Sequence, residues 1–178
     1  MRVEIVPGTL RDLSFIATNL RPQDQREIYC QLPEGITPAE IAVLSMMGRT
    51  WVAVLDGQPI AAFGIVPIAA SVLSLWCWGT PRMTRAVPAI TRYVRDELAP
   101  EWARLGVTRV EARSIAGHDA AHRWLRGQGF SSVPCPSYGR GCEDFLLFAI
   151  TRRDWDVLQR PGNAELGSER PAVPGTQP

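Results

Sequence analysis

Two histidines, His118 and His122, are four residues apart in the run HDAAHRWLRGQGF and are candidates for metal or proton chemistry. Residues at this spacing share one face of a helix. A zinc site needs at least three protein ligands, and no third ligand follows these histidines nearby in the sequence. We therefore predict no metal site. Because His118 stands at the start of the expected helix, it is predicted to be the helix cap, with Asp119 as an equal candidate.

The four cysteines, Cys30, Cys77, Cys135 and Cys142, form no C-x-x-C pair. Cys135 and Cys142 flank a loop rich in proline and glycine, where a crosslink is geometrically possible. Nothing in the sequence marks secretion, so we expect reduced thiols.

Three further side chains could take part in binding or catalysis. Glu111 lies on an expected strand and is a candidate general base, although on an exposed face it would be an ordinary solvated residue. Trp76 and Trp78 are two apart on another expected strand, so their indoles share a face. They could line a ligand groove, and core packing is the other interpretation.

The elements that position these residues form a mixed order of strands and helices. Alternating apolar residues predict strands, at 3–6, 51–55, 60–66, 72–78, 107–113 and 145–150. Residues 56–59 are the expected hairpin turn and residues 131–141 an expected loop. Apolar spacing of three and four, with capping residues, predicts helices, after Thr9, from Pro22, after Thr37, over 90–105 with a possible break at Pro100, and from His118 to Gly127 or Gly129.

Length and composition limit the classes of protein. A chain of 178 residues that is 46% hydrophobic can bury one core, and we expect a single soluble domain over residues 1–152. The net charge of +1, from 19 basic and 18 acidic residues, gives no global attraction to nucleic acid or membrane. The amino-terminal run MRVEIVPGTL has no apolar segment of signal length, and no run reaches the length of a membrane helix.

Residues 153–178 are expected to be an extended tail. From Pro161 onward the composition is rich in proline, glycine and polar residues and nearly free of bulky apolar ones. Such a segment cannot offset the entropy of ordering by itself. We predict that it is an interaction arm, and that removing residues 161–178 leaves the thermal midpoint of the domain nearly unchanged.

The run from His118 to Phe130 resembles the fourth helix of the Gcn5-related N-acetyltransferases, which read N-x-x-A-x-x-F-Y-x-K-x-G-F. Aligned on the closing Gly-Phe, His118 takes the Asn position beside the pantetheine, Ala121 the Ala, Trp124 the Phe and Leu125 the Tyr. The resemblance implies an α/β (α+β) fold, with an acetyltransferase-like mixed central sheet flanked by helices and splayed between its fourth and fifth strands. In that family the Tyr protonates the leaving thiolate, which a leucine cannot do.

The same resemblance implies a phosphate loop of the form Q/R-x-x-G-x-G/A before the long helix. Here the matching run starts at Arg82, carries Arg85 and Val87 at the two glycine positions, and is followed by Pro88. Arg82, Arg85 and His118 are the candidate cofactor-binding residues, with solvated arginines as the plainer interpretation of the first two. We expect weak or no binding of acetyl coenzyme A. Tyr138 and Cys142 are the reactive side chains near the expected acceptor mouth.

A second resemblance covers roughly residues 3 to 152. Aromatic and structural residues of the chain are similar to the internal virion protein A family of T7-like podoviruses, which has an acetyltransferase-like fold and acts in particle assembly. The residues that carry it are Asp12, Ile16-Ala17, Asn19-Leu20-Arg21, Asp24, Glu27, Phe63-Gly64, Trp76, Trp124-Leu125, Gly129, Tyr138, Gly141 and the run FLLFAI at 145–150.

We therefore predict a bacteriophage virion or morphogenesis protein on an inactive acetyltransferase-like fold, with no catalytic residues and no cofactor. Its partners would be portal or tail components, with a homo-oligomer possible and neither membrane nor specific nucleic acid. Its location would be the virion or the host cytoplasm. The alternative is an acetyl coenzyme A-dependent N-acyltransferase that works by orientation and a water-relayed base. A third class is a coenzyme A or nucleotide binding module without turnover.

Overall fold

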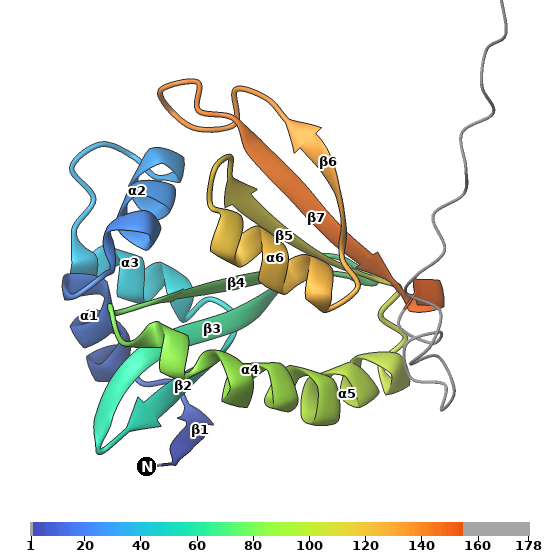
Figure 1. The fold of residues 1–178 in the computed structure, drawn as a ribbon, viewed down its shortest axis with the longest axis horizontal. Helices are drawn as coiled ribbons and strands as arrows, with labels where there is room; N and C mark the ends of the chain where they lie inside the picture. The colour runs from blue at the N-terminus through green and yellow to red at the C-terminus, as the bar shows by residue number, and fades with distance from the viewer. Residues whose placement is uncertain (1, 155–178) are drawn as a thin grey trace, which may run out of the picture.

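The structure is a computed structural model, and it describes residues 2–154. The expected arm at 161–178 lies outside the described residues. One mixed sheet is flanked by helices, as the sequence predicts (Figure 1). The strands are β1 (Val3–Pro7), β2 (Arg49–Leu55), β3 (Gln58–Ala69), β4 (Val72–Gly79), β5 (Arg109–Ile115), β6 (Ser131–Cys135) and β7 (Phe145–Thr151). The helical segments are α1 (Leu10–Thr18), α2 (Pro22–Gln31), α3 (Pro38–Ser45), η1 (Met83–Arg85), α4 (Val87–Tyr93), η2 (Val94–Leu98), α5 (Ala99–Arg104) and α6 (Asp119–Gly127).

The sheet has the strand order β1-β2-β3-β4-β5-β7-β6. Its only parallel pair within residues 2–154 is β4 with β5, and that ladder runs only from Val72↔Arg109 to Ser74↔Glu111. Beyond Ser74 the two strands diverge, and Figure 1 shows β4 and β5 close together at one end and far apart at the other. The expected splay is therefore present, and it leaves strand backbone facing a gap.

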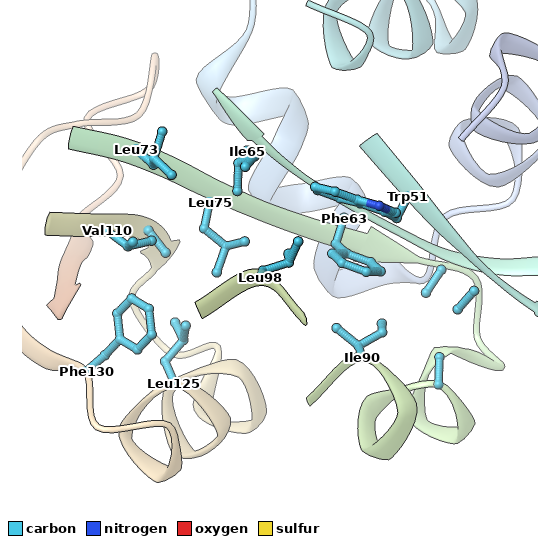
Figure 2. Packing of buried hydrophobic residues seen from close by; sticks show 14 of the residues in the cluster. Trp51, Phe63, Ile65, Leu73, Leu75, Ile90, Leu98, Val110, Leu125 and Phe130 are labelled. Atoms are coloured by element: carbon cyan, nitrogen blue, oxygen red, sulfur yellow. The ribbon is translucent and has the colours of Figure 1, made fainter. Parts of the chain in front are cut away.

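Helices cover both faces of the sheet. The larger buried cluster joins sheet residues such as Phe63 and Val110 to Ile90 of α4, Leu98 of η2 and Leu125 of α6 (Figure 2). On the other face, Leu13 and Ile16 of α1 and Ile41 of α3 pack on Val52 and Trp78. The two layers hold the splayed strands from both sides, so the gap is flanked by α2 on one face and α6 on the other.

The helix starts follow the capping signals. Thr37 accepts a hydrogen bond from the Glu40 amide at 3.3 Å, and Glu40 accepts one from the Thr37 amide at 2.8 Å. This reciprocal capping box satisfies two amides that the helix itself cannot. Thr9 likewise accepts a bond from the Asp12 amide at 3.2 Å and caps α1.

The β2–β3 hairpin is tighter than expected. Its turn is only Asp56-Gly57, with φ of 54° and 74°, and β3 already begins at Gln58. Two left-handed residues match the twist of the flanking strands. Pro59 was expected in the turn, yet it pairs with Val54 beside a register shift, where an absent amide costs little.

The helix predicted over 90–105 begins at Val87 and continues to Arg104, with a widened π-helical segment, η2, at its centre. Pro100 lies two residues after the last residue of this segment, Leu98. A proline inside a helix lacks an amide and crowds the carbonyl four residues earlier, and a wider turn relieves that clash. Pro100 therefore changes the local winding without ending the helix.

The prediction of a loop over residues 131–141 was wrong for its first half. Residues Ser131–Cys135 form β6, which pairs antiparallel with β7, and only residues 136–144 connect the two strands. Pro134 fits because β6 lies at the edge of the sheet, where an amide need not be donated.

Cys135 and Cys142 are both free thiols, as are Cys30 and Cys77. In the part of the chain that is described, no helix has the length and apolar character needed to cross a membrane.

Candidate active site at the splay

A cavity of about 300 Å³ opens where β4 and β5 separate. Its walls come from α2, α6, the two splayed strands, the segment before α4 and the β6–β7 loop. The lining residues are Arg21, Glu27, Ile28, Gln31, Ser74, Leu75, Trp76, Cys77, Trp78, Met83, Thr84, Val87, Ala112, Arg113, Ser114, His118, Ala120, Ala121, Trp124, Leu125 and Tyr138. Figure 1 shows α2 and the β6–β7 loop beside the open end of the splay. The cavity therefore lies where the fold leaves strand backbone without a partner.

Glu27, His118 and Ser114 form a polar cluster in the cavity wall. The Nδ1 of His118 lies 2.8 Å from the Oε2 of Glu27, and the Ser114 hydroxyl donates to the same oxygen at 3.0 Å. An ionised carboxylate can only accept, so Nδ1 carries the proton and Nε2 is left as the basic nitrogen. The side chains of His118 and Glu27 are only 6% and 16% exposed. Such a pair can take a proton from a bound substrate.

The prediction that His118 caps α6 was wrong. His118 occupies the N-cap position, but its side chain makes no capping bond, because the ring bonds to Glu27 instead. Asp119 lies in the first turn of the helix. Glu27 and Ser114 were not predicted as site residues. Glu27 comes from the polar run QDQRE and Ser114 from the end of β5, and neither position carries a local signal of a site.

A buried ion pair fixes α2 beside the end of β4. Asp24 is 3% exposed, bonds to the Arg21 side chain at 2.8 Å, and accepts the Gly79 amide at 2.7 Å. The Arg21 amide donates back to the Gly79 carbonyl at 2.9 Å. Burial raises the pKa of Asp24, against the opposing effect of Arg21. These contacts place Glu27, one turn further along α2, over the gap.

Two stacked indoles form one wall of the cavity. Trp76 and Trp78 have ring centroids 5.5 Å apart and planes 19° apart, so they share a face as expected. Both indoles line the cavity, and Trp78 is also buried in the core against α1 and α3, as the core-packing interpretation predicts. Trp76 lies flat over Gly64 of β3, where an added Cβ would come within 2.7 Å of the indole and of the Arg49 carbonyl. Gly64 thus allows the wide ring to lie on the sheet.

Leu125 lies in the core at the position of the family's tyrosine. It is 5% exposed and packs with Leu75, Val110 and Phe130, as Figure 2 shows. The prediction that it is a core residue is confirmed. One residue earlier, Trp124 donates from Nε1 to the Thr91 hydroxyl at 2.8 Å, which ties α6 to α4.

The other reactive side chains contribute less to the cavity. Burial and the nearby acidic groups Asp24 and Glu27 raise the pKa of the Cys77 thiol, so it stays protonated near neutral pH. Tyr138 lines the mouth and is 42% exposed, whereas Cys142 lies outside the cavity lining. Glu111 also lies outside it and is paired with Arg109 at 2.6 Å.

The predicted phosphate ligands lie outside the cavity. Arg82 pairs with Asp56 at 3.4 Å, and Arg85 lines a separate hollow beside β1. The amides of Met83, Arg85 and Ala86 are used in bonds within their own turn, and Pro88 has none. The residues present therefore fit the thioester arm of a coenzyme, which strand backbone at the splay can hold, better than they fit its diphosphate. Phosphate binding by Arg82 and Arg85 stays a prediction.

His122 packs away from the cavity. Its Nε2 donates to the Ile115 carbonyl at 3.1 Å, and its ring lies against Phe148 at a centroid distance of 5.2 Å. Burial lowers the pKa of His122, which keeps the ring neutral. Among residues 2–154 no group of three or more histidine, cysteine or acidic side chains is arranged to hold a metal ion.

The chain matches no protein-family model and no curated protein. Solved structures of similar fold include acetyltransferases. A GNAT-superfamily phosphinothricin acetyltransferase from Sinorhizobium meliloti, in complex with acetyl coenzyme A, is 16% identical with a TM-score of 0.65, over 85% of this chain and 89% of that one. The ribosomal-protein-alanine N-acetyltransferase from Brucella melitensis is 19% identical with a TM-score of 0.63, over 83% and 99%.

A third example is the ribosomal-protein-S5-alanine acetyltransferase from Vibrio fischeri, 15% identical with a TM-score of 0.62, over 87% of this chain and 96% of that one. At these identities the likeness shows the fold alone. The chain thus has the fold of the GNAT acetyltransferases, as its sequence predicts. None of these structures supports the resemblance to phage internal virion proteins.

Proposed function

We propose that this protein is an N-acyltransferase that moves an acyl group from acetyl coenzyme A to an amine. The observation that carries the proposal is the His118–Glu27 pair in the wall of a cavity at the splay. The acetyltransferase fold of its structural neighbours supports the same activity. The proposal reverses the main prediction from sequence, which was an inactive fold, and adopts its alternative.

The chemistry needs a base more than an acid. When bound, acetyl coenzyme A supplies a thioester whose carbon–sulfur bond breaks as the amine nitrogen bonds to the carbonyl carbon. His118 accepts the proton that the amine loses, through Nε2. Glu27 holds Nδ1–H and stabilises the imidazolium that results, while Ser114 orients Glu27. The departing thiolate takes its proton from solvent, since a thiolate is a weak enough base to leave without the missing tyrosine.

The splayed strands supply the rest of the site. The ladder between β4 and β5 ends at Ser74↔Glu111, so backbone of Leu75–Trp78 and 112–114 faces the gap. Amides of a pantetheine arm can pair with such groups as a short extra strand would. Orientation of amine and thioester in one small cavity would contribute most of the rate.

Detection of the acylated product tests the proposal. Purified full-length protein is incubated with acetyl coenzyme A and a mixture of amines and amino acids, and products are identified by mass spectrometry. We expect one or a few acetylated amines that are absent when the protein is heat-denatured. No protein-dependent product with any amine, from a folded sample, would contradict the proposal.

The role in phage particle assembly stays a prediction from sequence. It implies portal or tail partners and a location in the virion or host cytoplasm, and it allows a homo-oligomer. Copurification with particles or portal complexes is the test. Copurification together with absence of acyl transfer would restore the assembly role as the better interpretation.

A further inference from the structure

Arg113 of β5 lines the cavity with hydrogen-bonding capacity that the fold does not use. Its Nε is buried and has no hydrogen-bond partner among the described residues. Its one ion-pair contact within residues 2–154 is long, at 3.8 Å to Glu111. Glu111 is instead held by Arg109 at 2.6 Å, so two arginines share one carboxylate. Arg113 is therefore a positive charge at the cavity that lacks a full counter-ion.

The ring of Tyr138 holds this guanidinium in place. The Arg113 guanidinium carbon lies 5.2 Å from the Tyr138 ring centroid, and Tyr138 packs edge-on against Phe145. A guanidinium stacked on a ring can still donate in its own plane, in a geometry that matches a carboxylate. Because Nε is buried and the side chain as a whole is 29% exposed, the two Nη groups are the donors for a ligand. The arrangement thus positions the charge without neutralising it.

Charges of opposite sign therefore line the same small cavity. Glu27 is an acidic group paired with His118, and Arg113 is the basic group whose charge is only partly balanced. The apolar part of the cavity lining includes Ile28 and the stacked Trp76 and Trp78. A ligand that matches these features has an amine, a carboxylate and an apolar group.

The β6–β7 loop covers the cavity and limits the size of that ligand. The β6–β7 loop is fastened to the end of α2, because the Arg140 amide donates to the Cys30 carbonyl at 2.6 Å and the Arg140 side chain contacts Glu34 at 3.4 Å. A cavity of about 300 Å³ under such a roof suits a small molecule better than a folded protein.

We infer that the acceptor is a free α-amino acid with an apolar side chain, whose carboxylate is bound by Arg113 and whose amine faces the His118–Glu27 pair. This inference rests on the proposed acyl transfer and adds the substrate class. Arg113 acts as a specificity residue, since it binds the acceptor and takes no part in proton transfer. The apolar side chain of the bound amino acid packs on Trp76.

Calorimetric titration with matched ligands tests this without relying on turnover. The probes are phenylalanine, phenylalaninamide, phenethylamine and 3-phenylpropionate, with leucine as a second amino acid. We expect the two amino acids to bind about ten-fold or more tightly than the probes that lack either charge. Equal binding of phenylalaninamide and phenylalanine, or no binding of either amino acid at millimolar concentration, would overturn the inference.

Variants connect the preference to the residue. Arg113→Gln should lower the affinity for phenylalanine to that for phenethylamine and leave the affinity for phenethylamine unchanged. Arg113→Lys should keep part of the preference for phenylalanine. Arg123→Gln is the matched control, because Arg123 is an exposed arginine of α6 that does not line the cavity. Equal weakening of all probes by Arg113→Gln would contradict the assignment. If Arg113→Gln does not fold, Arg113→Lys and the ligand series decide.

The two proposals fail in different ways. Carboxylate-dependent binding without acetyl transfer would keep the substrate class and contradict the acyltransferase. Rapid transfer to phenethylamine that is insensitive to Arg113→Gln would keep the acyltransferase and overturn the substrate class.

Discussion

The Nδ1 of His118 and the Oε2 of Glu27 lie 2.8 Å apart although the two residues are 91 positions apart in the chain. The contact joins the start of α6 to α2 across the gap between β4 and β5. Because α2 and α6 lie on opposite faces of the sheet, the two side chains can meet only where the strands have separated. The splay thus creates both the cavity and the pair that lines it.

The two histidines of α6 make a matched comparison for catalysis. We expect His118→Gln to lower the rate of acetyl transfer about 100-fold or more, since it removes the base. His122→Gln should keep the rate, because His122 lies outside the cavity lining. Steady-state assays on both variants, with circular dichroism as the check of folding, measure this. Equal loss in both variants would point to a structural effect.

Acid should destabilise the protein partly through His122. Its pKa is lowered by burial, so the unfolded chain takes up the proton first as the pH falls below about 6.5. The stability that neutral His122 contributes is therefore present above that pH and is lost as the pH falls towards the lower folded pKa. We expect the thermal midpoint to fall less between pH 7.5 and 5.5 in His122→Gln than in the wild type. If the thermal midpoint falls by the same amount in His122→Gln and in the wild type, groups other than His122 control the loss of stability in acid.

Removal of the buried Asp24 carboxylate should be costly. Asp24→Ala leaves the Gly79 amide and the Arg21 guanidinium without their partner, and we expect a loss of about 3 to 5 kcal/mol in the free energy of unfolding. Asp24→Asn keeps an acceptor for the amide and should cost less. Urea denaturation measures both variants. Equal stability of Asp24→Ala and the wild type would show that the ion pair does not fix α2.

Restoring the family's tyrosine should not improve the enzyme. Leu125 is buried among apolar side chains, and a hydroxyl placed there without a partner costs about 1 to 3 kcal/mol. We expect Leu125→Tyr to be less stable than the control Leu125→Met and no faster than the wild type. A clear gain in transfer rate would show that the hydroxyl reaches the leaving sulfur.

The nucleotide part of acetyl coenzyme A should contribute little to binding and catalysis. The amides of Met83, Arg85 and Ala86 are already bonded within their turn, so the diphosphate lacks the cradle that the fold usually provides. We expect S-acetylpantetheine to be used with nearly the same kcat/KM as acetyl coenzyme A, and acetyl coenzyme A to bind weakly. Arg82→Gln and Arg85→Gln serve as controls. A rise in KM for acetyl coenzyme A alone, in either variant, would identify that arginine as a phosphate ligand.

Local signals in the sequence were enough to predict most of the fold. The alternating strands, the Thr37–Glu40 capping box and the helix after His118 are each encoded by neighbouring residues. Where prediction failed, the deciding contact was distant. β6 is a strand because β7 pairs with it, although its own residues include Pro134 and two serines.

The site was harder to predict for the same reason. His118 was identified as a candidate from its place in the motif, but the cap expected for it depended on local geometry, and Glu27 competes for the ring from another helix. Glu27 itself stands in a run of polar residues that is typical of a solvated helix face. Only the packing of α2, held by Asp24 on Gly79, brings it into the cavity.

The most direct measurement of the central claim is the initial rate of thiol release from acetyl coenzyme A in the presence of an acceptor amine, for Glu27→Gln and for Glu4→Gln. Glu4 is an exposed carboxylate on the edge strand β1, which β2 and β3 separate from the splayed strands, and it is the matched control. We predict amine-dependent release by the wild type and by Glu4→Gln, and a rate at least about 100-fold lower for Glu27→Gln at unchanged stability. Equal rates for the two variants, or no amine-dependent release by the wild type, would contradict catalysis by the Glu27–His118 pair.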